Sequence, residues 1–202
     1  MKKKARETKA RGAFRRAGGV LRTTQALRAG VHPRDLYALR EAGALERVSR
    51  GVYRLSDLPP LTEPDLVTVV TRVPKAVVAL VSALHFHGLT TEIPHHVSIA
   101  LPQGTARPKL DWPPLRIYRL SGVMFTSGIE THERDGVGVR VYGPAKTVAD
   151  CFRFRNRLGI QVALEALRTG LELRKFTPAE LLRAAKTCRV ERVVRPYLEA
   201  MQ

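Results

Sequence analysis

Residues 23–55, TTQALRAGVHPRDLYALREAGALERVSRGVYRL, decide the fold that the sequence predicts for the start of this chain. Thr23 and Thr24 can cap a short helix over residues 24–28, because hydroxyls accept hydrogen bonds from the free N–H groups at a helix start. The tight turn Ala29-Gly30-Val31 follows this helix. These signals indicate the first helix and the turn of a helix-turn-helix.

A second helix is predicted over residues 33–42. His32 stands at the capping position, and Pro33 occupies the first helical position, where its missing N–H costs nothing. Leu36 and Leu39 share one face and should be buried, and Gly43 ends the helix.

Two short β-like runs come next, residues 45–49 and 52–55, with Arg50-Gly51 as the turn between them. A helix, a glycine-containing turn, a second helix and a basic hairpin are typical of a winged helix-turn-helix. This module places one helix in a DNA groove and a hairpin beside it.

The charge of the chain is concentrated in the same region. The 202 residues carry a formal net charge of +17, of which residues 1–55 contribute +11 and the other 147 residues +6. A basic segment that coincides with this motif favours a nucleic-acid-binding module joined to a second domain of lower positive charge. A solvated basic surface that keeps the protein soluble is the alternative.

Length and composition restrict the class of protein. With 44% hydrophobic residues, the chain can bury one good core or two small ones. No apolar run approaches the roughly 20 residues of a transmembrane helix, and the basic N-terminus lacks the apolar core of a secretory signal. We therefore expect a cytoplasmic protein. Cys151 and Cys188 have no partners at metal-binding spacing, so we expect no disulfide framework, metal or cofactor.

Three parts are predicted along the chain. Residues 1–11 hold six Lys or Arg and almost nothing apolar, which indicates a basic flexible arm. Residues 12–57 form the winged helix-turn-helix domain, and the adjacent Pro59 and Pro60 exclude a helix from the linker. Residues 61–202 form a larger C-terminal domain.

The C-terminal domain should be α+β, with a small, largely antiparallel sheet packed among helices. Strands are predicted at residues 95–101, 115–120, 129–134 and 137–141, the last two joined by the turn Asp135-Gly136. Thr62 should cap a helix over residues 62–72, and Thr177 one over 178–188. Further helices are predicted at residues 75–87, 144–155, 159–173 and 190–201, and Pro196 should kink or split the last.

Taken together, the chain resembles the antitoxins of AbiEi-type, type IV toxin–antitoxin (abortive infection) systems, which are also transcriptional regulators. The resemblance rests on residues 23–55, on SALHFHGL at residues 82–89, and on YGPAKTVADCFRFRNRLG at residues 142–159. It implies a winged helix that represses its own operon and a C-terminal domain that counters a nucleotidyltransferase toxin.

The candidate DNA-binding residues lie in the two helices and the wing. The exposed positions of the second helix carry side chains that can reach bases or phosphates. Thr23, Thr24 and Gln25 stand at the start of the first helix, where hydroxyls and backbone N–H groups can bind a phosphate. The full candidate set is Thr23, Thr24, Gln25, Arg34, Asp35, Tyr37, Arg40, Arg47, Arg50 and Arg54. An ordinary solvated surface is the alternative for each of them.

Two other clusters suggest chemistry. His85, His87, His95 and His96 match no standard zinc spacing, so a helix end is favoured over a metal site. Lys146 and Asp150 are one helical turn apart and could belong to a nuclease-like site. We find no second acidic cluster to hold a divalent ion, so structural pairing is favoured and we expect no enzyme.

The sequence thus predicts a DNA-binding regulator whose partners are double-stranded operator DNA and, through the resemblance, a nucleotidyltransferase toxin. Two alternatives remain open. One is a nucleic-acid-processing enzyme that the basic winged helix delivers to DNA, and the other is a stand-alone repressor whose C-terminal domain only oligomerises.

Overall fold

The computed structural model describes the backbone of residues 2–201 and the side chains of residues 6–201. The chain forms two compact units. Unit 1 comprises Met1–Pro74 and Glu133–Val139, and unit 2 comprises Lys75–His132 and Arg140–Gln202.

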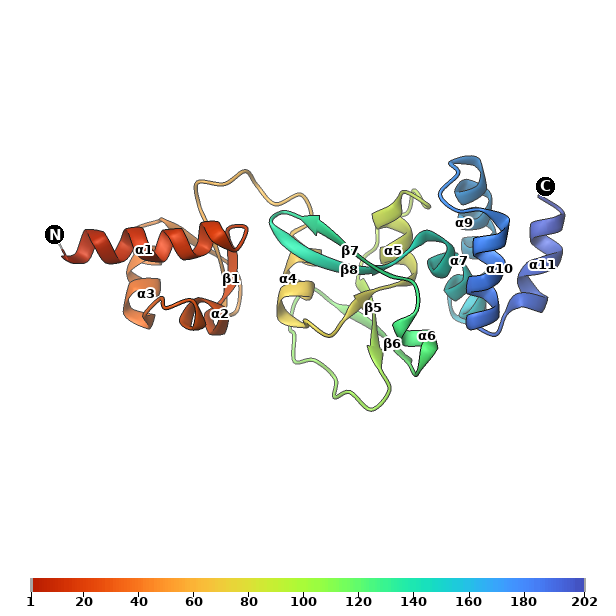
Figure 1. The fold of residues 1–202 in the computed structure, drawn as a ribbon, viewed down its shortest axis with the longest axis horizontal. Coiled ribbons are helices and arrows are strands. Elements are labelled where there is room, and N and C mark those ends of the chain that lie inside the picture. The colour runs from red at the N-terminus through yellow and green to blue at the C-terminus, as the bar shows by residue number, and fades with distance from the viewer. Residues whose placement is uncertain (1, 202) are drawn as a thin grey trace. The chain divides into compact units, whose positions relative to one another are not determined.

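Unit 1 is a helical and β-stranded module (Figure 1). Its elements are α1 (Lys2–Arg16), β1 (Val20–Arg22), α2 (Thr23–Arg28), α3 (Pro33–Glu41), β2 (Leu45–Ser49), β3 (Val52–Leu55) and α4 (Pro64–Arg72). The strands form an antiparallel sheet in the order β1-β3-β2, with Leu45 opposite Leu55. Helix α2, helix α3 and the β2–β3 hairpin confirm the predicted winged helix-turn-helix.

The turn between α2 and α3 depends on one glycine. Gly30 has a φ of 81°, in the left-handed region that favours glycine, and the Val31 N–H then donates to the Ala26 carbonyl at 3.0 Å. His32 caps α3 as predicted, because its Nδ1 accepts the Arg34 N–H at 3.2 Å. Leu36 and Leu39 are buried beneath the helix.

The predicted threonine cap of α2 is wrong. Arg22 is the N-cap, and its N–H donates to the Gln25 side-chain oxygen at 2.9 Å. Thr23 is already helical, and its hydroxyl donates to the Gly51 carbonyl at 3.4 Å. Strand β1 runs directly into α2, so strand pairing sets where the helix begins.

The N-terminal segment differs from the predicted arm, since α1 is a continuous helix over Lys2–Arg16. Ala10, Ala13 and Phe14 share one face and are buried in a cluster with Leu36 and Leu39. Packing against α3 therefore stabilises a helix of 15 residues that would be marginal in water by itself. The side chains of residues 1–5 lie outside the described set.

A second contact area of unit 1 joins α4 to the tip of a distant hairpin. Asp135 accepts hydrogen bonds from the Thr62 N–H at 3.0 Å, the Thr62 hydroxyl at 2.5 Å and the Glu63 N–H at 3.1 Å. Glu63, and not Thr62 as predicted, is the N-cap of α4. At the same tip, a Cβ on Gly136 would lie 1.9 Å from the Gly18 carbonyl oxygen, so the two backbones meet directly.

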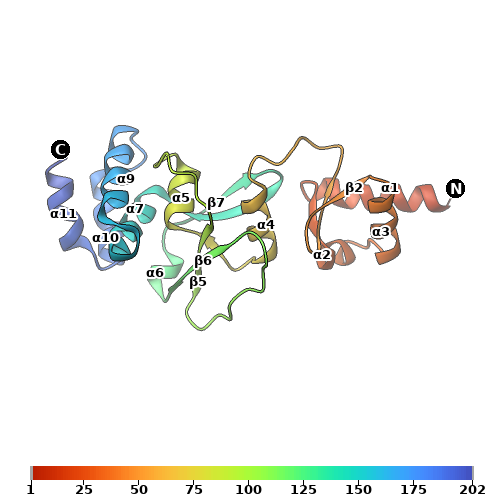
Figure 2. The same ribbon diagram turned by 180° about the vertical axis from the view of Figure 1, so that it is seen from behind.

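Unit 2 is built on a five-stranded sheet (Figure 2). Its strands are β4 (Val77–Val78), β5 (Val97–Pro102) and β6 (Leu115–Leu120), with β7 (Ile129–Arg134) and β8 (Val137–Tyr142), which continue into the hairpin tip of unit 1. The order is β6-β5-β4-β8-β7. The β4–β5 pair is antiparallel, whereas β5–β6 and β4–β8 are parallel. The α+β class is confirmed, but the sheet is mixed and not largely antiparallel.

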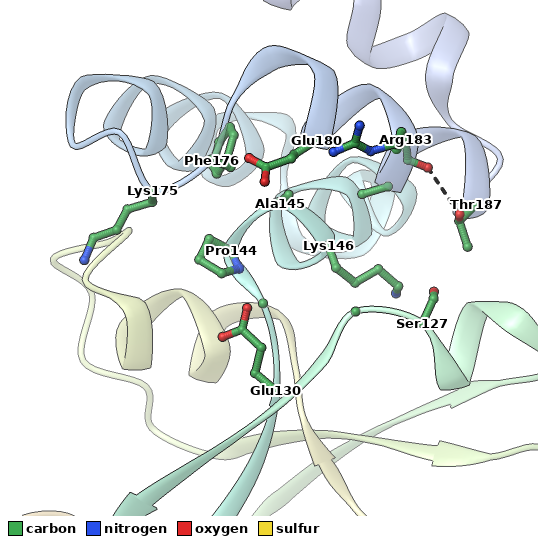
Figure 3. A pocket seen from close by; sticks show the side chains of 13 residues that line it. Ser127, Glu130, Pro144, Ala145, Lys146, Lys175, Phe176, Glu180, Arg183 and Thr187 are labelled. Carbon is green, nitrogen blue, oxygen red and sulfur yellow. Dashed lines mark hydrogen bonds between the residues drawn. The ribbon is translucent and has the colours of Figure 1, made fainter.

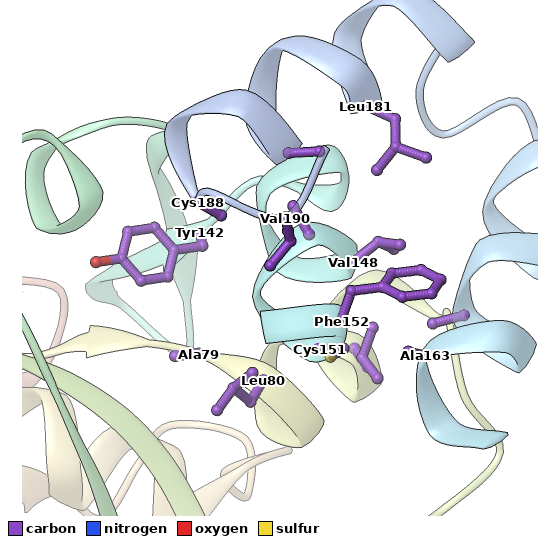
Figure 4. Close-up of a cluster of buried hydrophobic side chains, with 14 of the residues drawn as sticks. Ala79, Leu80, Tyr142, Val148, Cys151, Phe152, Ala163, Leu181, Cys188 and Val190 are labelled. Atoms are coloured by element: carbon purple, nitrogen blue, oxygen red, sulfur yellow. The ribbon is translucent and has the colours of Figure 1, made fainter. Parts of the chain in front are cut away.

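The helices of unit 2 surround a second core. They are α5 (Leu80–His87), α6 (Val123–Thr126), α7 (Pro144–Arg153), α8 (Arg155–Leu158), α9 (Ile160–Glu172), α10 (Pro178–Thr187) and α11 (Glu191–Glu199). Figure 4 shows Val148 and Phe152 of α7 among buried side chains from neighbouring helices. Thr177 caps α10 as predicted. Pro196 lies inside α11 and does not split it.

One predicted helix of unit 2 is partly wrong. Residues 75–79 are not helical, and Val77 and Val78 form β4, the central strand of the sheet. The run is apolar throughout, so its periodicity cannot separate a buried strand from a buried helix. No helix within residues 2–201 is long and apolar enough to cross a membrane.

Candidate nucleic-acid interface

The exposed side of α3 carries the polar residues that the sequence predicted there. Arg34 and Arg40 are exposed, and Tyr37 is 47% exposed although it is a large aromatic residue. The Arg40 guanidinium lies 5.5 Å from the centre of the Tyr37 ring, which holds the cation beside the aromatic face. Asp35 is half-buried and lies in the first turn of α3.

The start of α2 presents a smaller polar surface. Thr24 and Gln25 are exposed, whereas Thr23 is half-buried and bound to the Gly51 carbonyl of the wing turn. The Gln25 side chain is also occupied, because it accepts the Arg22 N–H. Of the three candidates in α2, Thr24 has the least constrained side chain.

The wing offers two of the three predicted arginines. Arg47 and Arg50 are exposed, and Arg47 Nε donates to the Ser49 carbonyl at 3.3 Å across a β-bulge. The Arg50 carbonyl accepts a hydrogen bond from the Arg72 guanidinium of α4, which fastens the wing turn. The wing therefore has cations on a constrained backbone.

Arg54 does not belong to this surface. It is only 4% exposed, and its guanidinium donates to the Glu46 carboxylate on the neighbouring strand. Arg54 and Glu46 are register partners on β3 and β2, so the residue stabilises the sheet. The sequence predicts Arg54 on the surface of the wing, but all four residues of β3 are buried.

The structure adds two cations to this surface, from the segment that the sequence predicts to be a flexible arm. Arg6 and Lys9 of α1 line a cleft of about 400 Å³ together with His32, Arg34 and Asp35 of the α3 start. The helical spacing of Ala10, Ala13 and Phe14 is the sequence signal that could have placed them, because it continues backwards to Arg6.

Unit 2 contains a different cavity, of about 380 Å³, between α10 and the start of α7 (Figure 3). Its acidic side chains are already engaged. Glu180 accepts the Thr177 N–H at 2.7 Å in a capping box, and Glu130 binds the His132 ring at 2.9 Å. Lys175 and Arg183 add positive charge at the rim. This mixture of charges defines no ligand class.

Lys146 and Asp150 form a buried ion pair of 2.5 Å beneath that cavity. Burial raises the pKa of Asp150 and opposes its charge, while Lys146 and the Cys188 thiol stabilise the ionised form. Lys146 also lies 4.1 Å from the centre of the Tyr142 ring. With both side chains below 5% exposed, the pair has the environment of a structural ion pair.

The four histidines do not converge on a common point. His87 Nε2 is bound to the Tyr142 carbonyl at 2.8 Å, and burial lowers its pKa. His85 and His95 are exposed on separate segments. Among the residues that the structure describes, no group of three or more His, Cys, Asp or Glu could hold a metal ion.

Comparison with known proteins shows where this fold occurs elsewhere. The chain resembles the crystal structure of the RV2827C protein from Mycobacterium tuberculosis, with a TM-score of 0.53 at 14% sequence identity, over 98% of this chain and 82% of that one. At this identity the likeness shows the fold alone. No curated protein sequence matches the chain.

A family model gives the more specific result. Its match begins within α1 and covers the helix-turn-helix and both wing strands. The resemblance predicted from the sequence is confirmed there: residues 13–56 match the AbiEi antitoxin family of transcriptional regulators.

Proposed function

We propose that this protein is the antitoxin and autoregulator of a type IV toxin–antitoxin system, in which unit 1 binds operator DNA and unit 2 counters a nucleotidyltransferase toxin. The observation that carries the DNA-binding half is the surface of α3. Arg34, Tyr37 and Arg40 are exposed there, and Arg47 and Arg50 extend from the wing within the same matched segment.

The chemistry of this surface suits a duplex. In the proposed complex, α3 enters the major groove, where an arginine pairs with guanine through two hydrogen bonds. The wing arginines contact phosphates and fix the register of the protein without reading sequence. Bound operator would then exclude RNA polymerase, which is how the protein represses its own operon.

DNA binding can be tested with the double variant Arg34→Ala/Arg40→Ala. We expect at least a tenfold loss of affinity for the duplex upstream of the gene, because each well-formed arginine–guanine contact contributes about 1–3 kcal/mol. Fluorescence anisotropy measures the affinity. The matched control Arg168→Ala/Arg174→Ala removes the same charge from exposed positions of unit 2 and should bind like the wild type. Equal affinities for both variants would refute this assignment of α3.

The antitoxin half rests on the family match and on the separation into two units. The full-length Arg34→Ala/Arg40→Ala variant should still restore growth when it is co-expressed with the nucleotidyltransferase encoded next to its gene. Loss of rescue by this variant, with its fold intact by circular dichroism, would mean that toxin neutralisation also needs the α3 surface.

A further inference from the structure

The cleft between α1 and α3 is basic for a structural reason. Helix α1 packs Ala10, Ala13 and Phe14 against α3. One turn earlier on the same face stands Arg6, at the position i−4 from Ala10. The face of α1 that is apolar at Ala10, Ala13 and Phe14 is therefore basic one turn earlier, beside the start of α3. Arg6 and Lys9 line the cleft there, next to Arg34.

The charges of this cleft are available for a ligand. The lining contains three permanent cations, Arg6, Lys9 and Arg34, against the single carboxylate of Asp35. Arg6, Lys9 and Arg34 are all exposed, and within the described residues no ion pair engages them. The cleft therefore has an excess of uncommitted positive charge.

The position of the cleft identifies the kind of anion. Arg34 belongs both to the cleft and to the exposed surface of α3, so the two surfaces are continuous. A duplex whose groove receives α3 carries one phosphate charge per about 1.7 Å of its length. Its backbone is the anion that lies within reach of the cleft.

We propose that Arg6 and Lys9 of α1 form a phosphate clamp, which binds the backbone of the same DNA duplex that α3 reads. This inference rests on the proposed DNA-binding function. Arg6 and Lys9 precede the matched segment, which begins at residue 13. The clamp adds affinity and fixes the approach of α3, but it carries no base specificity, since phosphates are the same at every sequence.

The test compares Arg6→Ala/Lys9→Ala with the wild-type chain on two duplexes, the region upstream of the gene and a scrambled sequence of equal length. Affinities are measured between 50 and 200 mM salt. Two lost phosphate contacts should reduce the slope of log affinity against log salt by about 1.8, so the loss at 50 mM exceeds the loss at 200 mM by about twelvefold. The ratio of affinities for the two duplexes should not change.

The control Arg15→Ala/Arg16→Ala removes the same charge from the other end of α1, outside the cleft. It should change the slope by much less. Alanine favours helix, and all four arginine or lysine positions are exposed, so circular dichroism should show intact folds.

Three results would overturn the clamp. They are an unchanged slope for Arg6→Ala/Lys9→Ala, an equal slope change in the control, and a changed preference between the two duplexes. If Arg34→Ala/Arg40→Ala weakens binding while the α1 variant does not, only the clamp fails. If the wild type does not bind the upstream duplex more tightly than the scrambled one, the proposed function fails instead.

Discussion

Asp135 should stabilise unit 1 far more than an exposed loop carboxylate does. Its two oxygens accept hydrogen bonds from the Thr62 N–H, the Thr62 hydroxyl and the Glu63 N–H, immediately before α4. In Asp135→Asn, one oxygen becomes an amino group that faces N–H donors, so one acceptor and the negative charge are lost. Asparagine still tolerates the left-handed φ of 50° at this position.

The size of the effect follows from these contacts. A hydrogen bond to a charged group contributes about 1.5–3 kcal/mol. Because Asp135 is half-buried, we expect a local loss of about 2 kcal/mol. That is roughly a thirtyfold increase in the opening equilibrium of the α4 start.

Hydrogen–deuterium exchange measures this opening directly. In Asp135→Asn, peptides that cover the start of α4 and the hairpin tip should exchange about thirtyfold faster at pH 7, while peptides from α9 in unit 2 stay unchanged. The matched control is Asp65→Asn, which removes a charge from an exposed position in the first turn of α4. Equal exchange in the two variants would show that the hydrogen bonds of Asp135 do not hold the start of α4.

The pH dependence provides an independent check. Partial burial opposes ionisation of Asp135, but the hydrogen bonds from Thr62 and Glu63 outweigh it and lower its pKa. A carboxyl with a lowered folded-state pKa stabilises the fold above its unfolded pKa, and this stabilisation is lost as the pH falls through the folded value. Wild type and Asp135→Asn should therefore become equally stable in strong acid.

Three further predictions concern single contacts. Gly136→Ala should lower the free energy of unfolding in urea by more than Gly104→Ala, for which we expect a loss of about 1–2 kcal/mol. Both glycines have positive φ, but only a Cβ at Gly136 would meet a neighbouring backbone. Equal losses in the two variants would contradict this close approach. Lys146→Met should lower the free energy of unfolding by about 3–5 kcal/mol, because Asp150 is then buried without its partner. The double variant Lys146→Met/Asp150→Leu should recover much of that loss. A double variant no more stable than the single one would show that the broken ion pair is not the cause. Arg54→Met should reduce stability by about 1–2 kcal/mol and leave the salt slope of DNA binding unchanged, whereas a reduced slope would return Arg54 to the interface.

The local signals of unit 1 predicted its elements well. His32-Pro33 and Gly43 delimit α3, and Arg50-Gly51 separates two strands whose bounds match the prediction. These features depend on residues within a few positions of one another, so the local sequence is sufficient to predict them. The face of α3 was also predictable, because Leu36 and Leu39 leave Arg34, Tyr37 and Arg40 on the other side.

The features that the sequence did not predict depend on distant partners. Helix α1 needs the buried face of α3, and β4 needs neighbours on both sides within the sheet. The inward side chain of Arg54 needs the carboxylate of Glu46 on another strand. Arg6 and Lys9 stand in a basic segment with almost no apolar residues of its own, so only the spacing of Ala10, Ala13 and Phe14 after it indicates that the helix continues back to them.

The contact between Gly18 and Gly136 sets an order of events during protein synthesis. Asp135 and Gly136, which contact the segment before α4 and Gly18, are made more than a hundred positions after Gly18 itself. A nascent chain that has emerged only as far as the winged helix lacks this hairpin tip, and the tip arrives after the first strands of unit 2. The last contacts of unit 1 therefore form after β4, β5 and β6 of unit 2 have been synthesised, and a chain truncated before Glu133 yields a winged helix that lacks them.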